Sequence, residues 1–132
     1  MKKMYILLLD ILDTGHAVNT AAHAGAMIQA HWPRISWIGG VEEAEESEDR
    51  DMADWYDNSF RKVTCKVTLE ELHAARQVAR DTLTPSICAG LPAEPMQYFE
   101  VTESAYGGKT VALVFKPRDT WPPFFKNLKL YS

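Results

Sequence analysis

The chain has 132 residues, of which 46% are hydrophobic and 24% are charged, and its formal net charge is −4. This length suits one domain with a single core, and the composition is typical of a soluble globular protein. No apolar run approaches the ~20 residues that a membrane-spanning helix needs, so we expect one cytoplasmic domain over residues 1–132. The two cysteines, Cys65 and Cys88, are too few for a disulfide framework and are predicted to be buried thiols.

The negative charge is concentrated in one segment. Residues 42–57 hold nine of the eighteen acidic residues and one base, Arg50, whereas the rest of the chain has thirteen bases against nine acids. Such a block is typical of a solvated, mobile loop; the alternative is a partner-facing segment that repels nucleic acid. We therefore predict a mildly basic domain with an acidic loop insertion at about 42–57 that folding does not require.

The N-terminal quarter predicts a buried strand followed by a helix. Residues 4–11 are almost entirely apolar and are interrupted by Asp10, which indicates a strand buried on both faces. A helix is expected from Gly15 to Trp32, with Asp13 or Thr14 as its cap and Pro33 ending it. This arrangement places polar groups at the carboxyl edge of a strand, where α/β proteins bind ligands.

The helix carries two stripes at helical spacing. The stripe predicted to face the sheet contains Ala21, Gly25, Ile28 and Trp32. The second stripe contains His16, Thr20, His23 and Met27, with Asn19 at its edge. Its histidines are either solvated, structurally hydrogen-bonded or proton carriers. They are seven residues and about 10.5 Å apart, too far to share one metal ion, and no metal motif occurs elsewhere, so we expect no metal or cofactor.

Five further elements complete the predicted fold. Residues 61–68 alternate as a strand, and Thr68 with Glu71 forms a capping box for a helix reaching about Thr82. Ser86–Ala89 is short and apolar. Residues 96–102 and 110–115 are predicted strands joined by a Gly-Gly hairpin, and 121–128 a last short helix. The order β-α-β-α-β-β-α predicts an α/β protein with three layers, α/β/α, and a mixed four-stranded sheet.

Several local motifs, in the same order, resemble the second family of peptidyl-tRNA hydrolases, the archaeal and eukaryotic type. Asp10, Gly15 and Ala22-His23-Ala24 match the family's first strand and helix, while His16 and Thr20 occupy its Lys and Gln positions. Thr102 and Thr110 match its two threonines, and the tail 125–131 is similar to its terminus. The family's catalytic Asp falls on Tyr98, with Glu100 two residues away.

The resemblance implies two alternative functions. In the first, the protein hydrolyses peptidyl-tRNA or a related acyl ester. His16 is then the base or an electrostatic partner, and Thr102 and Thr110 orient water. The phosphate contacts to tRNA would come from Lys116, Arg118, Lys126 and Lys129.

In the second, a divergent relative binds a small molecule or a protein partner in the same cleft. Asn19, Thr20, His23 and Glu100 would line that cleft, and its apolar walls would be Tyr98, Trp121, Phe124 and Phe125, whose alternative role is core packing. The family also implies a homodimer. A carboxylate within hydrogen-bond reach of His16, from Glu100 or another residue, discriminates between the two functions.

Overall fold

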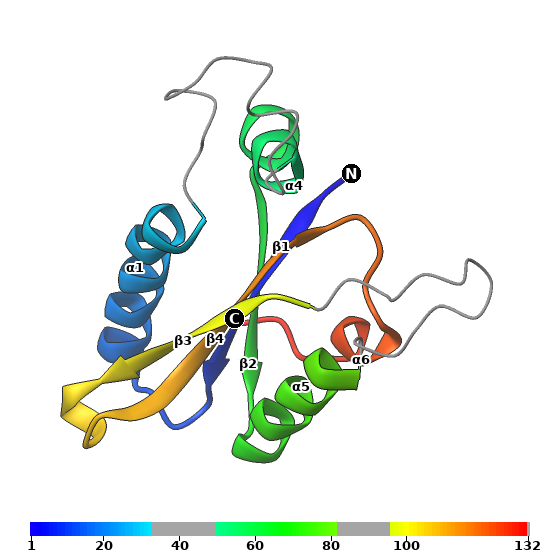
Figure 1. Ribbon diagram of the computed structural model, residues 1–132. Helices are drawn as coiled ribbons and strands as arrows, with labels where there is room; N and C mark the ends of the chain where they lie inside the picture. Colours follow the sequence, from blue (N-terminus) through cyan, green and yellow to red (C-terminus); the bar gives the residue numbers. More distant parts are fainter. Residues whose placement is uncertain (33–49, 82–95, 132) are drawn as a thin grey trace.

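The computed structural model describes residues 1–32, 50–81 and 96–131 (Figure 1). In this part of the chain one sheet is formed by β1 (Lys3–Leu9), β2 (Arg61–Val67), β3 (Tyr98–Glu103) and β4 (Lys109–Arg118), in the order β2-β1-β4-β3. β1 is parallel to β2, and β4 is antiparallel to both β1 and β3. The predicted α/β class and the mixed four-stranded sheet are confirmed.

Helices cover both faces of the sheet, which gives three layers (Figure 1). α1 (Thr14–His31) lies on one face, and α5 (Leu69–Asp81) with α6 (Pro123–Lys126) lies on the other. β1 contributes side chains to the hydrophobic cores on both faces of the sheet, because successive side chains of a strand point to opposite faces. Met4, Ile6 and Leu8 pack under α1, while Tyr5, Leu7 and Leu9 pack under α5 and α6. Burying each of these large apolar side chains contributes roughly 1.5–3 kcal/mol.

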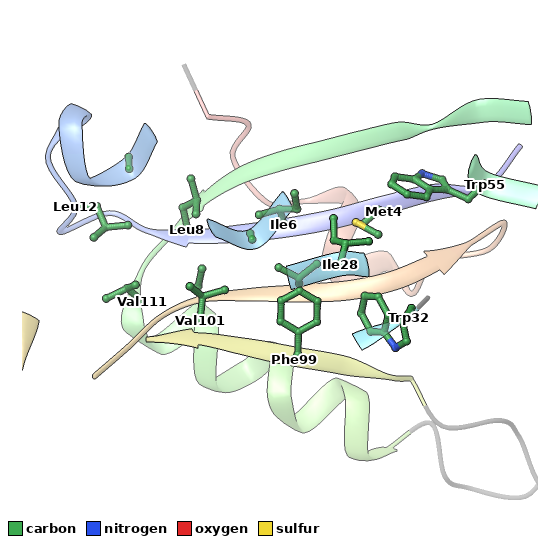
Figure 2. Packing of buried hydrophobic residues seen from close by; sticks show 14 of the residues in the cluster. Met4, Ile6, Leu8, Leu12, Ile28, Trp32, Trp55, Phe99, Val101 and Val111 are labelled. Atoms are coloured by element: carbon green, nitrogen blue, oxygen red, sulfur yellow. The ribbon is translucent and has the colours of Figure 1, made fainter. Parts of the chain in front are cut away.

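Figure 2 shows the core on the α1 side. Leu8, Ile6 and Met4 form a row, with Leu12 at one end and Trp55 at the other. Because β1 ends at Leu9, two residues before the predicted end, Ile11 lies in the following turn with its side chain 60% exposed.

α1 begins and ends within one residue of the prediction, and its buried face is rotated from the predicted one: Ile28 and Trp32 are buried as predicted and Ala21 is partly buried. Asp13 is the N-cap, as predicted, and its carboxylate accepts a hydrogen bond from the backbone N–H of His16. The buried residues are Ala17, Thr20, Ala24 and Ile28, whereas Gly25 is exposed. The helix is rich in alanine and poor in large apolar side chains, so its hydrophobic pattern does not define one face. Thr20, predicted on the second stripe, is buried on this face together with small alanine side chains.

The prediction of an acidic loop is wrong for residues 50–57. Arg50–Asp54 form a short helix, α4, and Trp55–Ser59 form a π-helical turn. Met52 and Trp55 are fully buried in the α1-side core, and the indole Nε1 of Trp55 donates to the carbonyl of Arg61 at 2.8 Å. These two apolar side chains outweigh the surrounding charge and fix the segment. Residues 42–49 of the insertion lie outside the described residues, as do residues 37–41, Ser86–Ala89 and Cys88.

α5 begins at the predicted capping box. The backbone N–H of Glu71 donates to Thr68 Oγ1 at 3.1 Å, and the backbone N–H of Thr68 donates to Glu71 Oε1 at 2.9 Å. The helix then buries Leu72, Ala75 and Ala79 against the sheet. Its first turn therefore lies at the carboxyl end of β2, directly beside the carboxyl end of β1.

The β3–β4 hairpin turns through Ser104–Tyr106, a single 3₁₀ turn, followed by two glycines with positive φ, Gly107 and Gly108. A register shift lies between Val101 and Thr102, so Val111 is an extra residue in β4. β4 is longer than predicted, and α6 is shorter than the predicted helix 121–128.

The outer strand β2 pairs with the C-terminal residues along its free edge. The C-terminal residues run along β2: Lys66 N–H donates to the carbonyl of Lys129, and Tyr131 N–H donates to the carbonyl of Thr64. Cys65 of β2 is a buried free thiol, which confirms the prediction. Burial, together with the negative charge of Glu71, raises the pKa of this thiol to about 11, which disfavours a nucleophilic role. Among the described helices, none has the length and apolarity needed to cross a membrane.

Candidate functional site

A pocket of about 470 Å³ opens at the carboxyl edge of the sheet, between α5 and the β3–β4 hairpin. Three chain segments line it. Leu9 ends β1 and Ile11 lies in the turn after it. Residues 108–111 come from the hairpin and the start of β4, and α5 contributes Leu69, Leu72, His73 and Arg76. The edge is the one at which the sequence predicted a site.

The wall of the pocket is mainly apolar. Leu9, Leu72 and Val111 are buried and form its inner part. Ile11 and Leu69 are 60% and 56% exposed, so two of the large exposed hydrophobic side chains of the described chain lie at this one site. The ionisable side chains that line it are the cations Arg76 and Lys109 and the imidazole of His73, and no acidic residue is among the lining residues.

Arg76 is held by a partner that does not itself line the pocket. Its Nε donates to Glu100 Oε1 at 2.7 Å, and its Nη2 donates to the same oxygen. Its Nη1 lies 3.0 Å from His73 Nδ1, which must act as the acceptor because a guanidinium has only donors. The Arg76 side chain is 20% exposed and that of Glu100 is 41% exposed. The pair therefore consists of a well-covered cation and a more exposed carboxylate.

The two predicted catalytic threonines are brought together at this site. Thr102 and Thr110 are opposite one another in the antiparallel register of β3 and β4, which places them on the same face of the sheet. Thr110 lines the pocket and is half-buried, and Thr102 beside it is exposed. Both hydroxyls therefore lie on the α5 side of the sheet.

His16 lies on the other side of the hairpin tip. Its Nδ1 is 2.9 Å from Asp13 Oδ2, and its ring meets the ring of Tyr106 edge-on at 5.2 Å between centroids. The hydrogen bonds from the backbone and ring of His16 lower the pKa of the Asp13 carboxyl. Asp13, rather than Glu100, is thus the carboxylate within reach of His16. Its second role was not evident from the sequence, where it was predicted only as a helix cap.

The other predicted residues of α1 do not converge on the pocket. His23 Nδ1 lies 4.0 Å from Glu103 Oε2, and Asn19 is exposed. Thr20 is fully buried, and its hydroxyl has no hydrogen-bond partner among the described residues. α1 covers the face opposite α5, so these residues and the pocket are separated by the sheet. Only His16 approaches the pocket's edge, through Tyr106, which precedes the pocket-lining Gly108 by two residues.

The remaining predicted residues lie toward the far end of β4. Arg118 is nine residues beyond Lys109, about 30 Å along an extended strand. Lys116 is on the same half of β4, with its ammonium 3.5 Å from Gln97 Oε1. Tyr98 is half-buried, and its ring packs 5.3 Å from that of Phe115. Trp121 and Phe125 are buried in the α5-side core, as the core-packing alternative predicted. The basic residues predicted to bind phosphate are therefore remote from the pocket.

Sequence reasoning missed His73 and Arg76. One signal was available: they are three residues apart on a helix, so they share a face, and the helix starts with a capping box at the ligand-binding edge. The partner of Arg76 could not be identified in this way, because Glu100 meets it only through the packing of α5 on the sheet. Within the described residues no three His, Cys, Asp or Glu side chains are grouped to hold a metal ion.

A scan against models of known protein families finds no match to this chain, and a search of curated proteins finds none either. What the site can do is therefore inferred from its geometry.

Proposed function

We propose that this protein binds a small organic molecule in the pocket between α5 and the β3–β4 hairpin. The observation that carries the proposal is a concave, mainly apolar site of about 470 Å³ on which a few polar groups, Arg76, Lys109 and Thr110, converge. Small-molecule sites have this character, with volumes of roughly 300–1,000 Å³ and a small number of polar groups that fix orientation.

The exposed apolar side chains support the same conclusion. Ile11 and Leu69 both line the pocket, from the turn after β1 and from the first turn of α5. Apolar surface left in water is unfavourable by roughly 25 cal/mol per Å², and exposed apolar surface that is grouped at one concave site marks a binding surface. A ligand with an apolar body would cover both side chains.

The proposal is tested with a neutral fluorescent probe, N-phenyl-1-naphthylamine, whose emission rises in apolar surroundings. The native protein is expected to bind it with saturation. The double variant Ile11→Asp, Leu69→Asp places two charges at the pocket and is expected to weaken binding about tenfold or more, since a charge must then be desolvated.

The matched control is Val18→Asp, which changes an exposed apolar residue of α1, the helix that covers the opposite face of the sheet. Near-ultraviolet circular dichroism checks that each variant is folded. Absence of saturable binding, or equal loss of binding in the control variant, would contradict the proposal.

A second candidate function is hydrolysis of peptidyl-tRNA or another acyl ester, and it rests on the Asp13–His16 pair. A carboxylate at 2.9 Å from Nδ1 orients the imidazole and leaves Nε2 directed away from the pair. Such an imidazole can accept a proton from water, and Thr102 with Thr110 lies across the hairpin tip. The resemblance of the local motifs to the second peptidyl-tRNA hydrolase family favours this chemistry.

The hydrolase candidate makes a clear prediction for His16. His16→Ala is expected to lower ester release from an N-acetylated aminoacyl-tRNA by about 100-fold or more, the usual effect of losing a general base. The melting temperature should change little, because the ring is partly exposed. His23→Ala, a second partly exposed histidine of α1, is the matched control and should retain the rate. Full activity of His16→Ala would exclude His16 as the base.

A further inference from the structure

Resting on the proposed small-molecule function, we infer that the ligand is a carboxylic acid with an apolar tail, and that its carboxylate takes the place of Glu100 on Arg76. The pocket would then hold an internal ion pair when empty and an intermolecular one when occupied. In the empty pocket, the Glu100 carboxylate would occupy the position on Arg76 that the ligand's carboxylate takes when it binds.

The charges at the pocket favour an anionic ligand. The lining residues include two cations, Arg76 and Lys109, and no acid. The carboxylate that neutralises Arg76 comes from Glu100 on β3, outside the lining. A cationic ligand would meet two like charges, whereas an anion would complement both.

The Arg76–Glu100 pair can exchange because its two members are unequally covered. The Glu100 side chain is 41% exposed, so its carboxylate can return to water at little cost. Arg76 is 20% exposed and also contacts His73 Nδ1, which keeps the guanidinium in position. Partly exposed ion pairs are weak because water and salt screen them.

Arg76 presents the donor geometry that a carboxylate requires. Its Nε and Nη2 already bind one carboxylate, that of Glu100, through the planar edge of the guanidinium. The apolar part of the site extends from Arg76 toward Leu69, seven residues earlier and about 10 Å along the helix. A headgroup on Arg76 would therefore leave a tail running along apolar side chains toward Leu69.

The test uses three compounds with the same tail, octanoate, octan-1-ol and octylammonium, as competitors of N-phenyl-1-naphthylamine. Octanoate is expected to displace the probe at a concentration lower by about tenfold or more than octan-1-ol, the scale of a charge-assisted hydrogen bond. Octylammonium should compete more weakly than both. Arg76→Gln should remove the advantage of octanoate over octan-1-ol.

Glu100→Gln provides the decisive comparison, because it weakens the internal competitor at a partly exposed position. It should strengthen octanoate binding several-fold and leave octan-1-ol binding unchanged. Glu70→Gln, which removes an equal charge from an exposed position in the first turn of α5, is the matched control.

The two proposals fail in different ways. If the probe binds but octanoate and octan-1-ol displace it equally, or if Glu100→Gln and Glu70→Gln have the same effect, the carboxylate inference is overturned and small-molecule binding stands. If the probe itself does not bind, the proposed function fails and the inference fails with it.

Discussion

Asp13 makes two interactions at the start of α1, both with His16. One carboxylate oxygen accepts the backbone N–H of His16, and the other contacts the imidazole Nδ1. Both interactions favour the ionised carboxylate, so they lower its pKa from the ordinary 3.8. The ionised carboxylate of Asp13 therefore both caps α1 and fixes the ring of His16.

This ionisation state makes α1 sensitive to acid. A carboxyl with a depressed folded pKa stabilises the protein above its ordinary value, and that contribution is lost as pH falls through the folded pKa. Asp13→Asn retains a capping side chain that does not titrate. We expect the melting temperature of the wild type to exceed that of Asp13→Asn at pH 6, and the difference to shrink as pH falls below about 3.8.

Thermal unfolding followed by circular dichroism across that range measures the difference. A gap between the two proteins that stays constant from pH 6 to acid would show that the Asp13 carboxylate has no stabilising role.

At the scale of elements, residues 50–60 show how two buried side chains can decide the structure of a segment whose composition predicts a loop. The charge of residues 42–57 predicts a solvated loop, yet Met52 and Trp55 are fully buried in the core on the α1 side. Figure 2 shows Trp55 beside Met4 of β1. The π-helical turn from Trp55 is followed by Phe60 in the left-handed region, with φ of 51°. Trp55 also packs against the rings of Tyr56 and Phe60. This segment therefore forms one end of the hydrophobic core on the α1 side of the sheet.

Truncating this side chain should consequently be costly. Trp55→Ala is expected to lower the free energy of unfolding by about 3–5 kcal/mol, because it leaves a cavity and removes a donor to the Arg61 carbonyl. Trp55→Phe should cost less, since most of the apolar contact remains. Chemical denaturation measures both values, with Val18→Ala on the surface of α1 as the control. A loss below ~1 kcal/mol in Trp55→Ala would mean that the segment is dispensable after all.

Elements were predictable from the sequence where a local signal was strong. The Thr68–Glu71 capping box predicted the start of α5, and the alternation in residues 61–67 predicted β2. Two glycines predicted the hairpin. Ile28 and Trp32 of α1 are buried as predicted. Which of its small residues are buried was not predictable, because alanine and glycine occur around the whole helix and the sheet decides which of them it contacts.

At the scale of the whole molecule, the sheet order creates the site. Placing β4 between β1 and β3 brings the hairpin tip to the carboxyl end of β1, and packing α5 on the same face closes the pocket. Thr102 and Thr110 could be predicted as a pair from motif order. The Arg76–Glu100 contact could not, because it depends on the rotation of α5 over the sheet.

The same order separates the remaining predicted residues into three places. His16 lies at the hairpin tip, His23 faces Glu103 under α1, and Arg118 ends β4 far from the pocket. Residues that are near one another in motif order therefore do not form one cleft.

The measurement that tests small-molecule binding most directly is chemical-shift mapping of the labelled protein during titration with N-phenyl-1-naphthylamine. The aromatic rings shift nearby amide signals strongly, so the bound position can be read residue by residue. We expect the largest changes at Ile11, Leu69, Gly108 and Thr110, with Val18 on the opposite face unchanged. Largest changes on α1, or small changes spread over the whole chain, would contradict binding in this pocket.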